Sequence, residues 1–217
     1  WKYARSPRYT RYMSESSSES PRSRGSYAKG IARRQEILDR AIEVFAQRGA
    51  RQTSLRAIAQ EVGVTHAALT HYFGSLDGLL VAVYRESERR SNEGNPAQPD
   101  VSPAQMMRIS AERNRNIPGL VQLYSTLVAS ALEDNHPAAQ QFATERFARV
   151  RANMATRVTH LQSAGKIRAD LDPQLVAALV IAASDGLQEQ WLLEPTLDHE
   201  AALEMLDQLL AEPSAST

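Results

Sequence analysis

The chain has 217 residues, 42% of them hydrophobic, with 25 basic and 25 acidic side chains and no cysteine. This length supports one or two hydrophobic cores, and the lack of cysteine excludes disulfides and thiolate catalysis. The histidines lack the spacing of a helical metal site and no apolar run is long enough to span a membrane, so we expect a cytoplasmic protein with no metal, no cofactor and no membrane contact.

Residues 1–28 are rich in Ser, Arg, Tyr and Pro and show no helical or strand periodicity. They are therefore predicted to form a disordered arm, and their lack of an apolar run argues against a secretory signal. The first helix is predicted from about Ile31 to Arg48, because its apolar residues recur on one face and Gly49 ends the pattern.

Residues 53–73 are predicted to form two short helices separated by Gly63. Four apolar side chains of the first helix share one buried face: Leu55, Ile58, Ala59 and Val62. Gly63 takes a positive φ without steric cost, and the hydroxyl of Thr65 can cap the second helix, which ends near Phe73. This arrangement is typical of a helix-turn-helix DNA-binding motif.

The residues after this motif are predicted to be helical almost throughout. Ser75 is the expected cap of a fourth helix that runs to about Arg90, and residues 91–101 form a linker rich in turn residues. Prolines, which are tolerated at the first position of a helix, mark helix starts near residues 102, 137 and 173. The later helices are expected from about 102, at 118–133, at 137–164, at 173–193 and at 198–211.

The helices at about 137–164 and 173–193 are predicted to pair with a second copy of the chain. Residues 175–183 are apolar around most of their helix, more than one face of a bundle requires, and their alanines permit close packing. A fully buried central helix in a monomer explains the same pattern. We favour a dimer, because pairing gives a helix-turn-helix protein a second DNA half-site.

Charge is distributed unevenly along the chain. Residues 1–74 hold 13 Lys and Arg against 6 Asp and Glu, whereas residues 75–217 hold 12 against 19. A basic helix-turn-helix segment attracts a polyanion and an acidic body is repelled by it, which supports DNA as the partner. Well-solvated arginine-rich helices are the alternative explanation of the charge.

Three segments closely resemble the TetR family of bacterial one-component transcriptional regulators: residues 37–49, residues 53–64 and His71-Tyr72-Phe73. The resemblance is continuous over about residues 29–84, and the remainder is similar to the family's ligand-sensing domain in layout. It implies an all-α fold of about nine helices, with a three-helix helix-turn-helix domain and a larger helical ligand-sensing and dimerisation domain. The expected domains are a basic, serine-rich arm at 1–28, the helix-turn-helix domain at 29–75, the ligand-binding and dimerisation domain at 76–213 and a tail at 214–217.

The resemblance also implies a function. Such a homodimer binds a palindromic double-stranded DNA operator, usually as a repressor, and releases it when a small-molecule effector enters the larger domain. By position, the residues that would contact phosphates or the DNA backbone are Thr53, Arg56, His71 and Tyr72. Those that would face the major groove are Thr65, His66, Ala67, Ala68 and Thr70. Capping by Thr65, solvent exposure of His71 and packing of Tyr72 are the ordinary alternatives, and Leu69 and Phe73 are expected in the core.

Three positions depart from the family's pattern. Leu76 stands where the family often has a phosphate-binding lysine, Gly74 where it often has proline, and Thr70 where it often has tyrosine. The lysine contact is therefore absent, and the loop at Gly74 and the groove contact at Thr70 are expected to differ.

The predicted recognition helix lacks long base-reading side chains. No Arg, Lys, Asn or Gln lies between Gly63 and Gly74, so the bidentate pairs that best distinguish guanine or adenine are missing. We expect specificity to come from His66 as a donor to guanine and from methyl groups of the same helix against thymine. A histidine donor predicts tighter DNA binding as the pH falls toward about 6.

The arm offers a further source of specificity, because basic residues insert into narrow minor grooves. The candidates are Arg22, Arg24 and Lys29. An arm that does not contact DNA is the alternative.

A ligand pocket in the acidic domain needs adaptable and aromatic side chains. Four stand on its predicted helices: Met107, Tyr124, Phe147 and Trp191. Plain core packing is the alternative for each. An effector weakens DNA binding only if it binds the DNA-incompetent form better, and the fourth helix, which joins the two domains, is expected to transmit the change.

An enzyme is not expected, because the predicted helices show no carboxylates paired with a histidine, no phosphate-binding glycine loop and no metal spacing. Two alternatives to a ligand-released repressor stay open. One is a nonspecific, nucleoid-type DNA-binding protein, and the other is an activator of the same fold.

Overall fold

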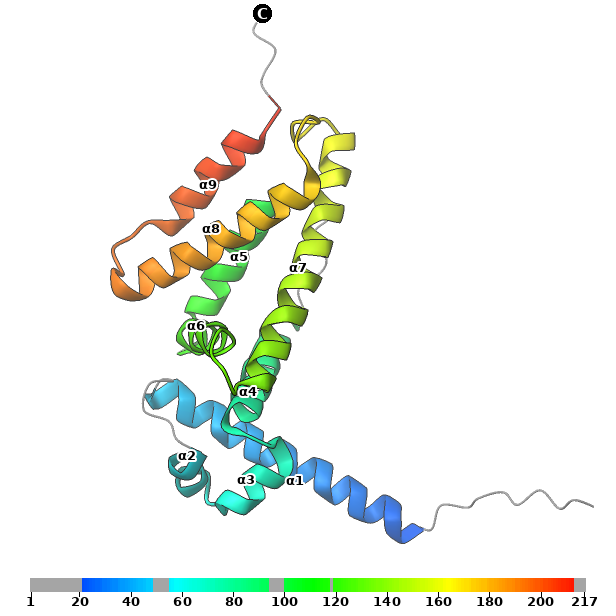
Figure 1. Cartoon of the computed structure of the whole chain (residues 1–217), viewed down its shortest axis with the longest axis vertical. Coiled ribbons are helices and arrows are strands. Elements are labelled where there is room, and N and C mark those ends of the chain that lie inside the picture. Colours follow the sequence, from blue (N-terminus) through cyan, green and yellow to red (C-terminus); the bar gives the residue numbers. More distant parts are fainter. Residues whose placement is uncertain (1–20, 49–54, 94–99, 118, 213–217) are drawn as a thin grey trace, which may run out of the picture. The chain divides into compact units, whose positions relative to one another are not determined.

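A computed structural model describes residues 21–48, 55–93, 100–117 and 119–212 of the chain (Figure 1). Every regular element in these ranges is an α-helix, which confirms the all-α prediction. The helices are α1 (Pro21–Arg48), α2 (Leu55–Val62), α3 (His66–Phe73), α4 (Leu76–Asn92), α5 (Pro103–Arg115), α6 (Leu120–Ser130), α7 (Pro137–Ser163), α8 (Pro173–Leu193) and α9 (His199–Leu210). No helix within the described ranges is both long enough and apolar enough to cross a membrane.

The chain forms two compact units, residues 1–35 and residues 36–217. In the first unit the described residues are the N-terminal part of α1, which begins at Pro21. This corrects the helix start expected near Ile31, since residues 21–28 were predicted as part of the disordered arm. Proline suits the first turn of a helix and Ala, Lys and Arg favour its interior, a local preference hidden by the serine-rich composition of the arm. Residues 1–20 lie outside the described ranges.

The unit of residues 36–217 contains two hydrophobic cores. The first core joins the part of α1 in this unit with α2, α3, α4, α6 and the start of α7. Its most deeply buried side chains include Ile37, Ile58, Leu69, Leu79 and Leu127. The helix-turn-helix therefore shares its core with α4 and α6, and no break in packing marks the domain boundary predicted after Ser75.

The second core lies between α5, the C-terminal half of α7, α8 and α9. Its buried side chains include Met154, Val158, Leu161, Val180 and Leu203. The long α7 serves both cores, because Phe142 packs into the first and Met154 into the second. The spacing of apolar residues in the sequence predicts a single buried stripe on this helix: Ala143, Phe147, Val150, Met154, Val158 and Leu161. This prediction is only partly right, because the buried Phe142 lies outside the stripe, whereas Phe147 and Val150 are half-buried.

Local signals set most helix starts as predicted. Pro103, Pro137 and Pro173 are the first residues of α5, α7 and α8. The side chain of Ser75 accepts a hydrogen bond from the amide of Gly78 at 3.0 Å and caps α4. The predicted helix at 118–133 is shorter in the structure, where α6 spans Leu120–Ser130.

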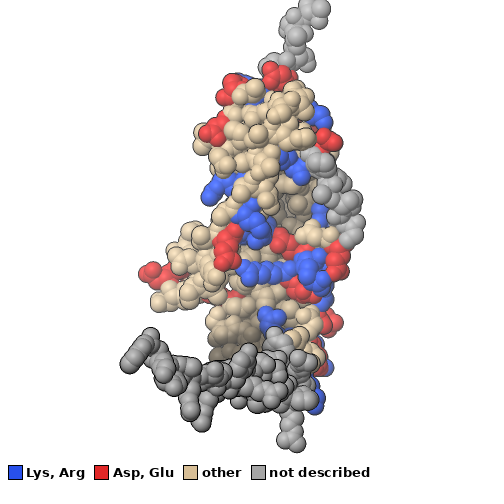
Figure 2. Space-filling view, turned by 90° about the vertical axis from the view of Figure 1, so that its right-hand side faces the viewer, with Lys and Arg blue, Asp and Glu red and all other residues tan. Residues whose placement is uncertain are grey.

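One face of the described surface mixes charges of both signs. On the face shown in Figure 2, Lys and Arg side chains lie beside Asp and Glu, so this face has no extended patch of one sign. Two ion pairs join α4 to α7, Arg85 with Glu145 at 3.1 Å and Glu88 with Arg146 at 2.6 Å.

Candidate nucleic-acid interface and ligand cavity

The turn between α2 and α3 sets the angle of the helix-turn-helix. Gly63 has φ +72°. The amide of Val64 donates to the carbonyl of Ala59 at 2.9 Å, and the amide of Gly63 donates to the carbonyl of Gln60 at 3.2 Å. These two bonds form a Schellman motif, which satisfies the last carbonyls of α2 and requires a left-handed residue where glycine stands.

Helix α3 buries one face and exposes the other. Leu69 is fully buried, as predicted. Phe73 was also expected in the core, but it is only half-buried, because it is the last residue of α3 before the Gly74 turn. Tyr72 is half-buried against the first core, which supports a packing role for it. Among the predicted groove-facing residues Ala68 is half-buried, and the exposed ones, with His71, are Thr65, His66, Ala67 and Thr70.

Two threonine hydroxyls on this surface are used within the helix. Oγ1 of Thr65 accepts a hydrogen bond from the amide of Ala68 at 3.1 Å, so Thr65 caps α3. Oγ1 of Thr70 donates to the carbonyl of His66 at 3.1 Å. The hydroxyl proton of Thr70 is therefore occupied, and its methyl group is the part suited to a thymine methyl.

The other predicted DNA contacts are less completely described. Arg56 is exposed in the first turn of α2. Thr53 lies outside the described residues, as do the side chains of Arg22 and Arg24. Lys29 is exposed in the described part of the first unit.

Sequence reasoning missed Arg40, which joins α1 to the end of α2. Its Nη1 donates to the carbonyl oxygen of Val62 at 2.9 Å, and its Nη2 lies 3.3 Å from Oε1 of Glu36. An arginine on the polar face of a helix is normally solvated, so the sequence gives no signal for this bond.

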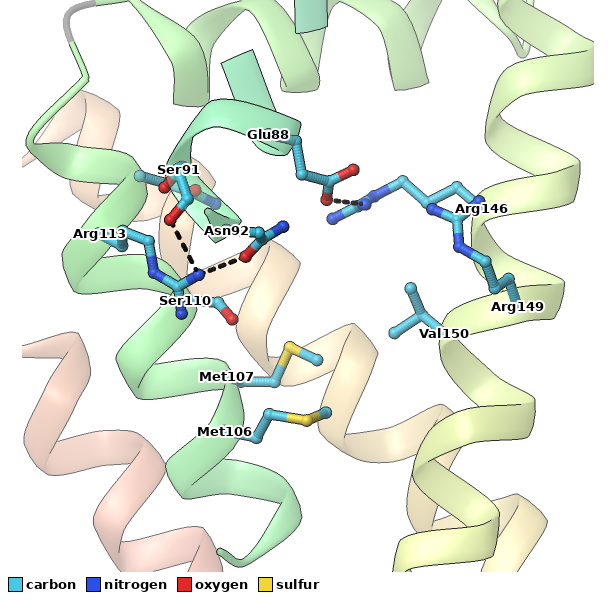
Figure 3. Close-up of a pocket in the computed structure, with 11 residues that line it drawn as sticks. Glu88, Ser91, Asn92, Met106, Met107, Ser110, Arg113, Arg146, Arg149 and Val150 are labelled. Atoms are coloured by element: carbon cyan, nitrogen blue, oxygen red, sulfur yellow. Dashed lines mark hydrogen bonds and ion pairs between the residues drawn. The ribbon is translucent and has the colours of Figure 1, made fainter. Parts of the chain in front are cut away.

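A cavity of about 360 Å³ opens between α4, α5 and α7 (Figure 3). Its apolar lining is Met106, Met107 and Val150. Its charged lining is Glu88 from α4, Arg113 from α5, and Arg146 and Arg149 from α7. The cavity lies where the two cores meet, since α4 belongs to the first core and α5 to the second.

Arg146 is the centre of a buried polar network behind this cavity. Its Nη1 lies 2.6 Å from Oε1 of Glu88, and its guanidinium carbon lies 5.3 Å from the ring centroid of Tyr84 and 4.9 Å from that of Tyr124. The Tyr124 hydroxyl donates to Asp185 at 2.9 Å. Burial raises the pKa of both tyrosines and of the Asp185 carboxyl above their ordinary values.

The four predicted ligand-binding residues do not converge on one place. Met107 lines the cavity, and Tyr124 lies behind it against Arg146. Phe147 packs against the second core. Trp191 contacts His199 edge to face, with ring centroids 6.4 Å apart. The cavity arginines were not predicted, because arginines on a helix are usually solvated.

Helix α8 is buried on one side only. Val176, Ala177 and Val180 lie in the second core, whereas Leu175 and Leu179 are each 64% exposed and Leu193 is 81% exposed. The alternative of a central helix buried on all sides therefore does not describe this chain.

Two family models match the chain. The model described as bacterial regulatory proteins, tetR family, matches residues 37–83, and that of the BetI-type transcriptional repressor C-terminal domain matches residues 110–213. The HTH-type transcriptional regulator BetI of Brucella anthropi is 43% identical over 53 residues, which are 24% of this chain and 27% of that protein. The chain thus aligns with only about a quarter of this relative. These names are those of regulators and not of enzymes.

Solved structures match over most of the chain. A member of the TetR family from Streptomyces coelicolor A3 is 31% identical, with 84% of this chain and 99% of that chain covered and a TM-score of 0.59. A transcriptional regulator from Saccharomonospora viridis in complex with choline shares the fold at 20% identity, with 84% and 100% covered and a TM-score of 0.62.

Proposed function

The chain belongs to the TetR family of bacterial regulatory proteins, and we propose that it is a cytoplasmic transcriptional repressor that binds a palindromic DNA operator through α3. One observation carries this proposal. Leu69 anchors α3 in the core while Thr65, His66, Ala67, Thr70 and His71 project from its exposed side. A rigid helix with small and polar exposed side chains fits the major groove, and its methyl groups and His66 are its means of reading bases.

A homodimer supplies the second half-site. Leu175, Leu179 and Leu193 leave an apolar row exposed on α8, and a second copy that covers this row would bring two α3 helices onto one operator. Replacing Leu175 and Leu179 together by Glu should convert a dimer to a monomer in light-scattering mass measurements. Leu132→Glu is the matched control, because Leu132 is 86% exposed and is not part of α8. If the double variant stays dimeric, this face of α8 is excluded as the dimer interface.

Release of DNA is proposed to follow from a small molecule in the cavity between α4, α5 and α7. Helix α4 begins directly after the α3 turn and shares the first core with α3, so a change at its far end reaches the DNA-binding helices. One structural neighbour holds choline, a quaternary ammonium ion, which makes a cation one candidate class of effector.

Footprinting on the DNA that flanks the chain's own gene tests the proposal. A symmetric protected site is expected. Protection without sequence preference would instead indicate the nucleoid-type binder. An activator is distinguished by a protected site upstream of the promoter of the regulated gene. Transcription of that regulated gene should then fall when the gene that encodes this chain is deleted.

A further inference from the structure

The lining of the cavity carries unbalanced positive charge. Three arginines face one carboxylate, and that carboxylate, Glu88, is already paired with Arg146. Among the described residues, Arg113 donates only to neutral acceptors of α4, the carbonyl of Ser91 and the amide oxygen of Asn92. Arg149 lines the cavity as an exposed residue and makes no hydrogen bond or ion pair with any other residue in the described part of the chain. A partly enclosed site with uncompensated guanidinium groups favours an anion.

The aromatic surface that a cationic effector would use is already covered. Tyr84 and Tyr124 have ring centroids 5.5 Å apart, and the guanidinium of Arg146 lies over both rings. The chain's own cation thus takes the cation–π position at this wall. A quaternary ammonium ion would have to enter beside three arginines without such a surface.

The opposite side of the cavity is apolar. Met106 and Met107 extend into it from α5 and Val150 faces it from α7, as Figure 3 shows. Methionine side chains adapt to varied apolar groups. The volume of about 360 Å³ accommodates a charged head and a short hydrocarbon tail.

We propose that the effector of this cavity is an organic anion, with a carboxylate or phosphate head bound by Arg113, Arg146 and Arg149 and a short apolar tail against Met106, Met107 and Val150. This inference rests on the proposed function, whose effector class it names.

The same residues give the anion a means of acting on α4. Glu88 and Asn92 are α4 residues whose side chains are held by Arg146 and Arg113, respectively. An anion that binds these guanidinium groups competes with Glu88 for Arg146 and with Ser91 and Asn92 for Arg113. Binding therefore loosens the attachment of the C-terminal end of α4 to α5 and α7, and the loosening lowers operator affinity.

Three probes with one tail and different heads test the charge preference: octanoate, octyl phosphate and octyltrimethylammonium. Calorimetry on the full chain should detect binding of at least one anion and markedly weaker binding of the ammonium ion. The two anions separate a carboxylate from a phosphate preference. Binding of the ammonium ion as tight as that of the anions, or no binding of either anion at millimolar concentration, would overturn the proposal.

Variants locate the site and test the competition. Arg149→Met should weaken anion binding about tenfold. Arg151→Met, an exposed residue further along α7 that does not line the cavity, should leave it unchanged. Glu88→Gln removes the internal competitor and should tighten anion binding about three- to tenfold. Weaker or unchanged binding in Glu88→Gln contradicts the competition.

Operator binding separates this inference from the proposed function. Without any probe, the wild-type chain should bind its operator, and the better anion should weaken that binding. If the chain binds its operator and no anion weakens that binding, the anion effector is rejected and the proposed repressor function is not. If the wild-type chain shows no specific operator binding without any probe, the proposed function is rejected.

Discussion

The guanidinium of Arg40 donates a hydrogen bond of 2.9 Å to the carbonyl oxygen of Val62, the last residue of α2. Val62 directly precedes Gly63, so the bond fastens the turn of the helix-turn-helix to α1. A Cβ added at Gly63 would lie 3.6 Å from Nη1 of the same arginine, which is an ordinary contact. The turn therefore has space for a side chain, and only its backbone conformation requires glycine.

Replacement of Gly63 tests this distinction. With φ at +72°, Gly63→Ala should lower the free energy of unfolding by about 1–2 kcal/mol. Gly63→Asn should cost less, because asparagine tolerates the left-handed region. Urea denaturation measures both. Equal losses in the two variants would mean that steric contact and not φ is the cause.

Gly78 has the opposite constraint. A Cβ there would lie 2.1 Å from the carbonyl oxygen of Phe73, so α4 cannot keep its present approach to the end of α3. We expect Gly78→Ala to lower the free energy of unfolding by about 2–3 kcal/mol. Gly30→Ala is the control, because nothing lies within 4 Å of a Cβ at that helical position. A Gly78 variant as stable as the Gly30 variant would show that the junction adjusts freely.

Thr65 has a capping role in the structure and a proposed base contact, and two substitutions separate them. Thr65→Ser keeps the oxygen that accepts from Ala68 and removes only the methyl group. Thr65→Ala removes both and should cost about 1 kcal/mol of stability. If the methyl group contacts thymine, both variants should lose operator affinity in anisotropy titrations. Thr65→Ser with wild-type affinity would leave Thr65 with capping alone.

His199 should make the fold sensitive to acid. It is 1% exposed, and neither ring nitrogen has a hydrogen-bond partner in the described structure. Burial, with a smaller effect of the Arg115 charge, lowers the pKa of His199 below its ordinary value of 6.5. As the pH falls, His199 is therefore protonated in the unfolded chain before it is protonated in the folded protein. The contribution of neutral His199 to the free energy of unfolding is fully present above pH 6.5 and is lost as the pH falls below 6.5.

The comparison with His199→Leu isolates this contribution. Between pH 7 and pH 5 the free energy of unfolding of the wild type should fall more steeply than that of the variant, by at most about 1.4 kcal/mol per pH unit. Parallel pH profiles would show that His199 is protonated in the folded protein without penalty.

The helix-turn-helix could be predicted from sequence because its signals are local. Apolar spacing places Ile58 and Val62 in the core, Gly63 marks the turn, and Thr65 and Ser75 supply capping oxygens within three residues of the amides they bind. Each feature depends on a few neighbouring residues.

The cavity could not be predicted, because it depends on how distant helices meet. Arg113 and Arg146 stand on helical faces that sequence alone treats as solvated, and their partners Asn92 and Glu88 are 21 and 58 residues away. Phe142 was missed for a related reason, since α7 turns different faces to two cores along its length.

The most direct test of the central claim is the ratio of affinities for two duplexes, the footprinted operator and a scrambled duplex of the same length and composition, measured by anisotropy at physiological salt. A specific repressor should bind its operator at least about 10³-fold more tightly. A ratio near one would contradict a specific regulator and would identify a nonspecific DNA-binding protein.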